Sequence, residues 1–192
     1  QILIEISNRY QQALTTYFHG DLSKVAPMAI IWGGEVRMAN LCVCACQAIN
    51  GTALMPGETF SFNQATGQRT TEKGYKSAGA IAAGQSIEEV GGGICQVSST
   101  LFNAVARANL EIVSRSPHAW PSTYVNIGED ATVNWPNLDF QFKNNTNSPI
   151  FIITYYKDRR MSAEIWGMSL GEGVTIDLQS TVIKTIDPPS EI

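Results

Sequence analysis

Three consecutive glycines, Gly91 to Gly93, break the chain sharply and directly precede a helical pattern. The apolar residues that follow have the spacing of one buried helix face: Val97, Leu101, Ala104 and Ala108. Because glycine has no Cβ, such a turn can bring its backbone close to another element or to a ligand. The pattern predicts a helix from Cys95 to about Asn109 that starts at a tight, glycine-rich turn.

The rest of the chain divides around this helix. An apolar stripe over residues 35–49, stopped by Asn50 and Gly51, predicts an earlier helix. Residues 56–93 are rich in turns, with short strands near 60–62 and 78–83. Later segments alternate like strands: 111–114, 119–125, 131–135, 139–143, 150–156, 161–166 and 174–178. Helices followed by strands indicate an α+β fold, with N-terminal helices and a Cys-bearing helix packed on an antiparallel β-meander.

Three parts of the chain are expected. Residues 1–34 have no clear pattern, residues 35–180 form the main domain, and residues 181–192 resemble a linker. Because no apolar run reaches the about 18 to 20 residues that span a bilayer, no membrane span is expected. The chain starts at Gln1 without a leader, so we expect a fragment whose anchor lies upstream. With a net charge of −4 and no basic cluster, nucleic acid is not an expected partner.

The four cysteines do not have the pattern of a disulfide framework, because Cys42, Cys44 and Cys46 crowd together and Cys95 stands alone. On a helix, only Cys42 and Cys46 share a face, which is a poor metal-binding arrangement. Free cysteine usually behaves as a small buried hydrophobe. We therefore expect a structural helix, no bound metal and no cofactor.

Cys95 is the candidate nucleophile. At the first turn of a helix, the unpaired N–H groups and the positive end of the helix dipole stabilise a thiolate. The same N–H groups could hold the oxyanion of a tetrahedral intermediate. Alternatively, Cys95 packs under the loop and the glycines only form a turn. Ser98 or Ser99 is a less favoured nucleophile, because hydroxyls inside a helix usually bond back to its backbone.

A thiol nucleophile needs a base, and the sequence has only His19 and His118. His118 precedes a predicted strand, whereas His19 lies in a predicted turn, so His118 is preferred. Two acids could orient its imidazole. If residues 119–125 and 131–135 pair as a hairpin, Asp139 lies near His118 and Asp130 lies at the far end. Asp139 is therefore the first choice and Asp130 the second.

Several segments closely resemble the VanW-like family over about residues 37–167. They include Asn50-Gly51-Thr52, Pro56-Gly57-Glu58-Thr59-Phe60-Ser61-Phe62-Asn63, Gly91-Gly92-Gly93-Ile94-Cys95-Gln96-Val97-Ser98-Ser99-Thr100, Pro117-His118, Asp130-Ala131-Thr132-Val133 and Phe142-Lys143-Asn144-Asn145-Thr146. The resemblance implies a bacterial envelope protein related to an accessory protein of vancomycin-resistance clusters, often with a membrane anchor upstream and a small β domain downstream. The family name implies no settled activity. The resemblance also implies that the full protein lies on the extracellular face of the envelope, where it is anchored in the membrane or associated with the wall.

The order Gly93-x-Cys95, His118-Ala119-Trp120, Asp139 also resembles, more weakly, transglutaminase-like and papain-like cysteine enzymes. The first hypothesis is therefore a cysteine-dependent amidase, peptidase or acyl transferase that acts on peptidoglycan stem peptides. The candidates for contacting the substrate or its oxyanion are Gly92, Gly93, Gln96 and Trp120. The alternative is a non-catalytic wall-binding or partner-binding module, in which exposed aromatics stack on sugars or peptides: Trp120, Tyr124, Trp135 and Tyr155.

Overall fold

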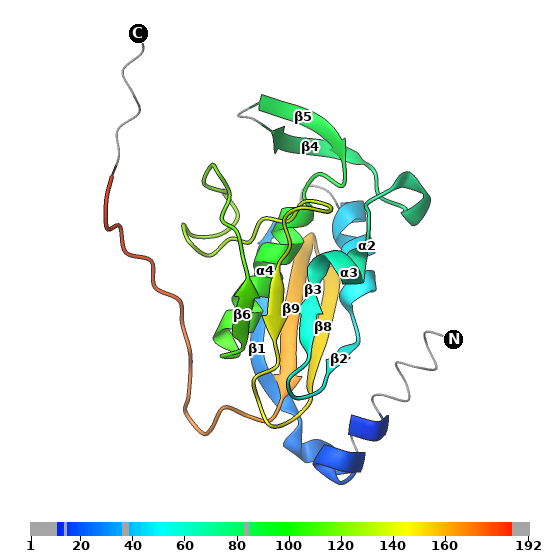
Figure 1. Ribbon diagram of the computed structural model, residues 1–192, viewed down its shortest axis with the longest axis vertical. Coiled ribbons are helices and arrows are strands. Elements are labelled where there is room, and N and C mark those ends of the chain that lie inside the picture. The colour runs from blue at the N-terminus through cyan, green and yellow to red at the C-terminus, as the bar shows by residue number, and fades with distance from the viewer. Residues whose placement is uncertain (1–10, 14, 36–38, 83–84, 186–192) are drawn as a thin grey trace.

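The computed structural model describes residues 11–13, 15–35, 39–82 and 85–185 (Figure 1). The helical elements are η1 (Leu22–Lys24), α2 (Ala39–Ile49), α3 (Phe62–Thr66), η2 (Thr71–Lys73) and α4 (Ile94–Arg107). The strands are β1 (Ala26–Glu35), β2 (Thr52–Leu54), β3 (Thr59–Ser61), β4 (Ser77–Ala82), β5 (Gln85–Val90), β6 (Glu111–Ser114), β7 (Gln141–Lys143), β8 (Ile150–Lys157) and β9 (Arg160–Gly167).

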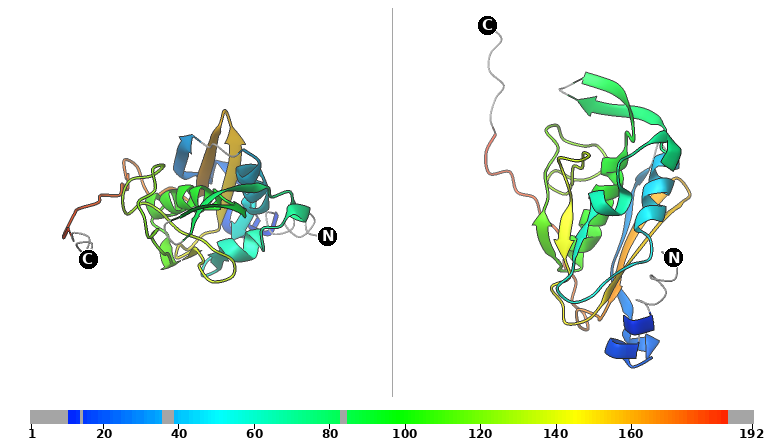
Figure 2. Two further views of the ribbon diagram at one scale, coloured as in Figure 1. Left: turned by 90° about the horizontal axis from the view of Figure 1, so that it is seen from above. Right: turned by 45° about the vertical axis from the view of Figure 1, so that its right-hand side comes forward.

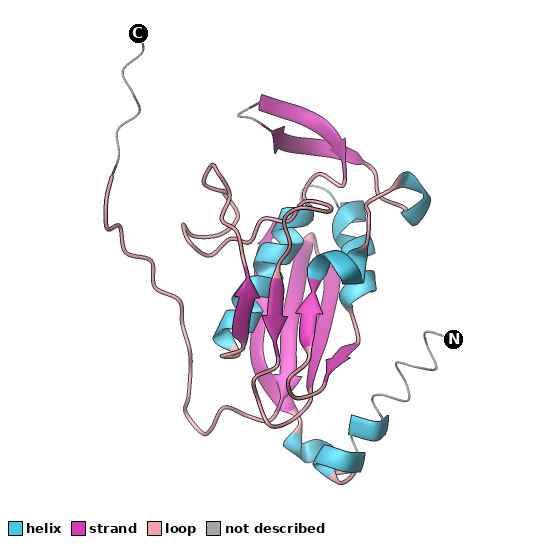
Figure 3. Cartoon of the chain, in the orientation of Figure 1, coloured by secondary structure: helices cyan, strands magenta, loops and turns pink. Residues whose placement is uncertain are grey.

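The strands of the described residues form three antiparallel sheets. The largest has the order β1-β9-β8-β2, the second has the order β3-β7-β6, and β4 pairs only with β5. The tight turn at Asp158 and Arg159, both at positive φ, joins β8 to β9. Figure 3 shows helices packed beside antiparallel strands. The predicted α+β class is confirmed.

Helices α2 and α4 pack on one face of the four-stranded sheet, and the three-stranded sheet lies on the other side of α4 (Figure 2). The fully buried α4 residues Val97 and Leu101 face the core, as the sequence pattern predicts. Burial of each such side chain stabilises the fold by about 1.5–3 kcal/mol. At the contact of β1 with α4, a Cβ on Gly33 would lie 2.5 Å from Thr100 Oγ1. Glycine there lets the strand and the helix approach closely.

Two segments leave this body. The β4–β5 hairpin projects from the end where α4 begins, and residues 168–185 run as an extended tail along the outside (Figure 1). The tail is attached to the body where Arg107 Nη2 lies 2.9 Å from Asp177 Oδ1 and where Leu178 packs on the core. Because β5 ends at Val90, the hairpin leads directly into the glycine turn that starts α4.

Most predicted elements are present, including both helices and the strands at residues 111–114, 150–156 and 161–166. Three predicted strands, 119–125, 131–135 and 174–178, are wrong: these residues lie in loops, with one isolated bridge between Asn134 and Leu138. Pro117 and Pro121 remove backbone N–H donors that a ladder would need. The N-terminal region without a clear pattern contributes β1, an edge strand of the main sheet.

Candidate active site

Cys95 lies in the first turn of α4, next to the glycine turn. Gly91 and Gly93 adopt positive φ values of 94° and 91°, which glycine accepts without strain. The Cys95 side chain is half-buried, and its Sγ donates to the carbonyl of Val133 at 3.5 Å. The sulfur therefore faces the loop between β6 and β7, which carries His118.

The imidazole of His118 is held by Asp130. His118 Nδ1 lies 2.5 Å from Asp130 Oδ2, and the His118 backbone N–H donates to the same oxygen at 2.6 Å. Arg115 Nη2 donates to the other carboxylate oxygen at 2.8 Å. Burial alone would raise the pKa of Asp130, but the hydrogen bonds from His118 and the charges of His118 and Arg115 together lower it. The carboxylate is thus ionised and fixes the orientation of the ring.

The carboxylate of Asp139, the first choice from sequence, has partners other than His118. It accepts from Ser61 Oγ at 2.6 Å, from the Asn63 N–H at 2.8 Å and from Gln141 Nε2 at 2.8 Å. The register argument was wrong because the hairpin it assumed does not form. The acid that orients the imidazole is Asp130, the second choice, and Asp139 instead holds the start of α3.

Tyr124 lies against the other side of the imidazole. Its hydroxyl is 3.3 Å from His118 Nε2, and the two rings meet edge to face at 6.2 Å. Burial raises the pKa of Tyr124, and the neighbouring Cys95 raises it further, against the lowering effect of a hydrogen bond with Ser99. The Tyr124 hydroxyl is therefore protonated at neutral pH and lies within electrostatic reach of both His118 and Cys95. Sequence analysis gave Tyr124 only a stacking role.

The expected substrate-contacting residues are placed less uniformly. Gly92 is buried and Gly93 is exposed. Gln96 is buried, and its Nε2 donates to the Glu35 carbonyl at 3.3 Å, a contact that ties α4 to β1. Trp120 is 63% exposed. The N–H groups of Ile94 and Gln96 donate within the turn, to Gly91 and Gly93 at 3.2 and 3.1 Å, so these two donors already have acceptors.

Arg69 lies next to the glycine turn before Cys95, and sequence analysis missed it. Its Nη2 donates to Asn63 Oδ1 at 2.8 Å, and its guanidinium lies 5.8 Å from the centre of the Phe62 ring. The Arg69 Nε and Nη1 atoms are buried and have no hydrogen-bond partner among the described residues. Leaving a buried polar donor without an acceptor costs about 1–3 kcal/mol, and more for a charged group. No spacing or motif marks Arg69, since it belongs to a turn-rich segment.

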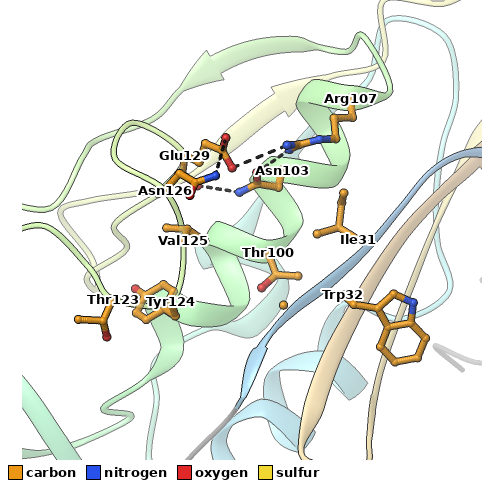
Figure 4. A pocket seen from close by; sticks show the side chains of 11 residues that line it. Ile31, Trp32, Thr100, Asn103, Arg107, Thr123, Tyr124, Val125, Asn126 and Glu129 are labelled. Carbon is orange, nitrogen blue, oxygen red and sulfur yellow. Dashed lines mark hydrogen bonds and ion pairs between the residues drawn. The ribbon is translucent and has the colours of Figure 1, made fainter. Parts of the chain in front are cut away.

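A pocket of about 400 Å³ runs along α4, with Tyr124 at one end and Arg107 at the other (Figure 4). Its wall opposite α4 includes Trp32 of β1. Asn103 Nδ2 donates to the Glu129 carbonyl at 2.7 Å, and Arg107 Nη1 donates to Asn103 Oδ1 at 2.6 Å. These bonds hold the loop that ends in Asp130 against α4. The pocket thus shares Tyr124 with the His118 cluster.

The cysteines of α2 lie elsewhere. Cys42 and Cys46 are buried in the core, which confirms that they share a face, and Cys44 is half-buried. Burial raises the pKa of each of Cys42 and Cys46 to about 12. All four cysteines lie among the described residues and are thiols, not disulfides. The α2 thiols remain protonated at neutral pH.

Comparisons with known proteins place this site within a family. A family model described as VanW like protein matches residues 36–166, an interval that includes Arg69, Cys95, His118 and Asp130. The chain is 46% identical over 152 residues to a Bacillus subtilis protein named YoaR, covering 79% of this chain and 46% of that protein. It is 29% identical over 137 residues to the vancomycin B-type resistance protein VanW of Enterococcus faecalis, covering 69% of this chain and 50% of that protein.

This chain therefore spans about half the length of the curated relatives it matches. No solved structure matches it. The weaker resemblance to transglutaminase-like enzymes finds no support in these comparisons, and His118 lies in a loop instead of on a strand. Within the described residues, no helix has the length and apolar character needed to cross a membrane.

Proposed function

The chain belongs to the VanW-like protein family, and we propose that it is a cysteine-dependent enzyme that cleaves or transfers peptide amide bonds. The observation that carries this proposal is the chain of contacts from Asp130 through His118 to Tyr124, next to the helix turn that presents Cys95. An ionised acid, an oriented imidazole and a half-buried thiol are the groups that nucleophilic catalysis at an acyl carbon needs.

In the proposed reaction, the Cys95 thiol gives its proton to His118 Nε2, either directly or through the Tyr124 hydroxyl. The thiolate attacks the amide carbonyl, and a tetrahedral intermediate forms. As the C–N bond breaks, the imidazolium returns the proton to the leaving amine, and a thioester remains on Cys95. Water or a second amine then attacks the thioester, which gives hydrolysis or acyl transfer and restores the thiol. Asp130 stabilises the imidazolium throughout.

We propose peptidoglycan stem peptides as the substrate and the extracellular face of the bacterial envelope as the location. The support for both is the similarity to a relative named for vancomycin resistance.

The test is to incubate the purified protein with purified peptidoglycan and to follow two signals. Mass spectrometry should detect a thioester on the peptide that contains Cys95, and chromatography should detect new or lost stem-peptide amines. The Cys95→Ala variant should show neither signal, and its thermal midpoint should stay within a few degrees of wild type. The same turnover by Cys95→Ala as by wild type would exclude the proposed mechanism.

One observation favours a second candidate, a non-catalytic wall-binding module. Several tryptophan side chains are exposed, Trp32 at 48%, Trp120 at 63% and Trp135 at 40%, and Trp32 also lines the pocket. Such rings can stack on sugar or peptide groups. If this candidate holds, Cys95→Ala should bind peptidoglycan as well as wild type does, and the combined Trp120→Ala and Trp135→Ala variant should lose binding. No acyl-enzyme would form with either protein.

A further inference from the structure

The guanidinium of Arg69 is held in place on one side and left without acceptors on the other. Arg69 Nη2 donates to Asn63 Oδ1. The Asn63 side chain is itself held in place, because its Nδ2 donates to the Leu138 carbonyl at 2.9 Å. Nε and Nη1 are buried and have no acceptor among the described residues. Most buried donors in proteins do have partners, so an exception of this kind calls for a specific explanation.

No carboxylate of the described chain supplies the missing acceptor. Among the acids, Asp139 interacts with Arg69 electrostatically. Its oxygens, however, already accept from Ser61, Asn63 and Gln141. Arg69 thus contributes a positive charge for which the described side chains provide no ion pair, since arginine stays protonated in proteins.

Arg69 also lies at the glycine turn that presents Cys95. A Cβ placed on Gly91 would meet Arg69 Cβ at 2.9 Å and Arg69 Cγ at 3.1 Å, so the turn rests directly on the arginine stem. Arg69 and Cys95 interact electrostatically, but the buried Nε and Nη1 atoms form no hydrogen bond to the sulfur. The two functional groups are therefore neighbours, and the glycine turn covers the stem of the arginine.

We infer that Arg69 forms a carboxylate-binding subsite beside Cys95, so that the preferred substrate is a peptide with a carboxylate near the amide that Cys95 attacks. This inference rests on the proposed function. Guanidinium donors match the two oxygens of a carboxylate, and such charge-assisted pairs are strong and directional. Arg69 as a whole is only half-buried, and the turn above it has no side chain at Gly91. A carboxylate would enter by displacing this turn.

The test measures binding instead of turnover and uses the Cys95→Ala protein as its parent. Three tripeptides are compared by calorimetric titration: one with a free C-terminal carboxylate, one with only a side-chain carboxylate, and one with both groups amidated. One carboxylate peptide should bind at least about tenfold more tightly than the fully amidated peptide, and which one does so identifies the source of the carboxylate. Adding Arg69→Met should abolish this preference, and Arg69→Lys should restore it only in part.

The matched control is Arg159→Gln in the same parent, which removes an exposed charge paired with Glu35 on the β8–β9 side. It should leave the preference unchanged. If Arg69 had only a structural role, Arg69→Met would lose thermal stability, and the preference for a carboxylate peptide would persist or would be absent from the parent as well. Either result would overturn the inference. If the preference depends on Arg69 but wild type forms no thioester, the subsite stands and the proposed enzyme activity fails.

Discussion

The two cysteine-bearing helices present the same functional group in opposite surroundings. On α2, Cys42 and Cys46 are 1% and 2% exposed and lie in the main apolar core, where burial raises the pKa of each to about 12. On α4, Cys95 is half-buried at the first turn and contacts a backbone carbonyl. Position in the helix and the polarity of the neighbours, not the number of cysteines, determine which thiol can react.

The loops around each helix make the same distinction. The C-terminal part of α2 is fixed structurally, because the Cys46 carbonyl accepts from Thr154 Oγ1 at 2.8 Å. At the start of α4, Cys95 instead interacts electrostatically with Tyr124 and with Arg69, and Tyr124 contacts His118. The hydrogen bond at the end of α2 is made within the protein, whereas Arg69, next to the start of α4, has two donors without acceptors among the described residues.

The largest effect is expected from removing the thiols themselves. Under the proposed mechanism, Cys95→Ala should lower turnover of peptidoglycan amides by at least about a thousandfold, because Cys95 is the thiol beside His118 and Tyr124 that would carry the thioester. The double variant Cys42→Ala and Cys46→Ala should stay within about threefold of wild type in rate, while it loses about 1–2 kcal/mol of stability from core volume. Rate assays and chemical denaturation measure the two effects. A large rate loss in the double variant would contradict the conclusion that the α2 thiols are only structural.

The next effect concerns alkylation at neutral pH. With a pKa of about 12 in place of the ordinary 9.0, each buried α2 thiol has about a thousandth of the usual thiolate fraction at pH 7. Iodoacetamide should therefore label Cys95 at least about 100-fold faster than Cys42 or Cys46, as timed peptide mapping can measure. Equal labelling of these three sites in the folded protein would show that Cys95 has no special environment.

Sequence analysis predicted the helices and their buried faces well because apolar periodicity reports directly on burial. It also proposed Cys95 and His118 as catalytic candidates, a prediction that stays open, since a cysteine behind three glycines and the scarcity of histidines leave few choices. It could not place residues 115–140, because a loop held by side-chain bonds, such as Arg115 to Asp130, has no periodic signal. The preference for Asp139 depended on a strand pairing in that region and failed with it.

Arg69 could not be predicted from the sequence for a different reason. Its significance is that two buried donors lack acceptors, which only coordinates can reveal. Tyr124 was noticed as an aromatic residue, but its contact with His118 depends on the same irregular loop. For a site assembled from loops, the sequence therefore indicates which residue types take part, but it does not indicate which of them contact one another.

A smaller and pH-dependent effect is expected at Asp130. Because its pKa is lowered in the folded state, the stability that it contributes is present above the ordinary carboxyl pKa of 3.8 and is lost as pH falls through the folded value. Asp130→Asn should lower stability at pH 7 by about 2 kcal/mol and flatten the stability loss of wild type below about pH 4. It should also slow turnover about 10- to 100-fold by misorienting His118. Urea midpoints across pH 3 to 7 and parallel rates test both, and an unchanged rate would remove Asp130 from the mechanism.

The smallest effect distinguishes the two acids. Asp139 holds the N-terminus of α3 through Ser61 and the Asn63 N–H, so Asp139→Asn weakens a cap and should cost about 1 kcal/mol of stability. The amide keeps one acceptor oxygen, and the contact between His118 and Asp130 is untouched. The rate at saturating substrate should therefore change less than about threefold. If Asp139→Asn slowed turnover as much as Asp130→Asn does, the imidazole would depend on the acid that the hairpin register had favoured, and the surroundings of Cys95 would differ from those described here.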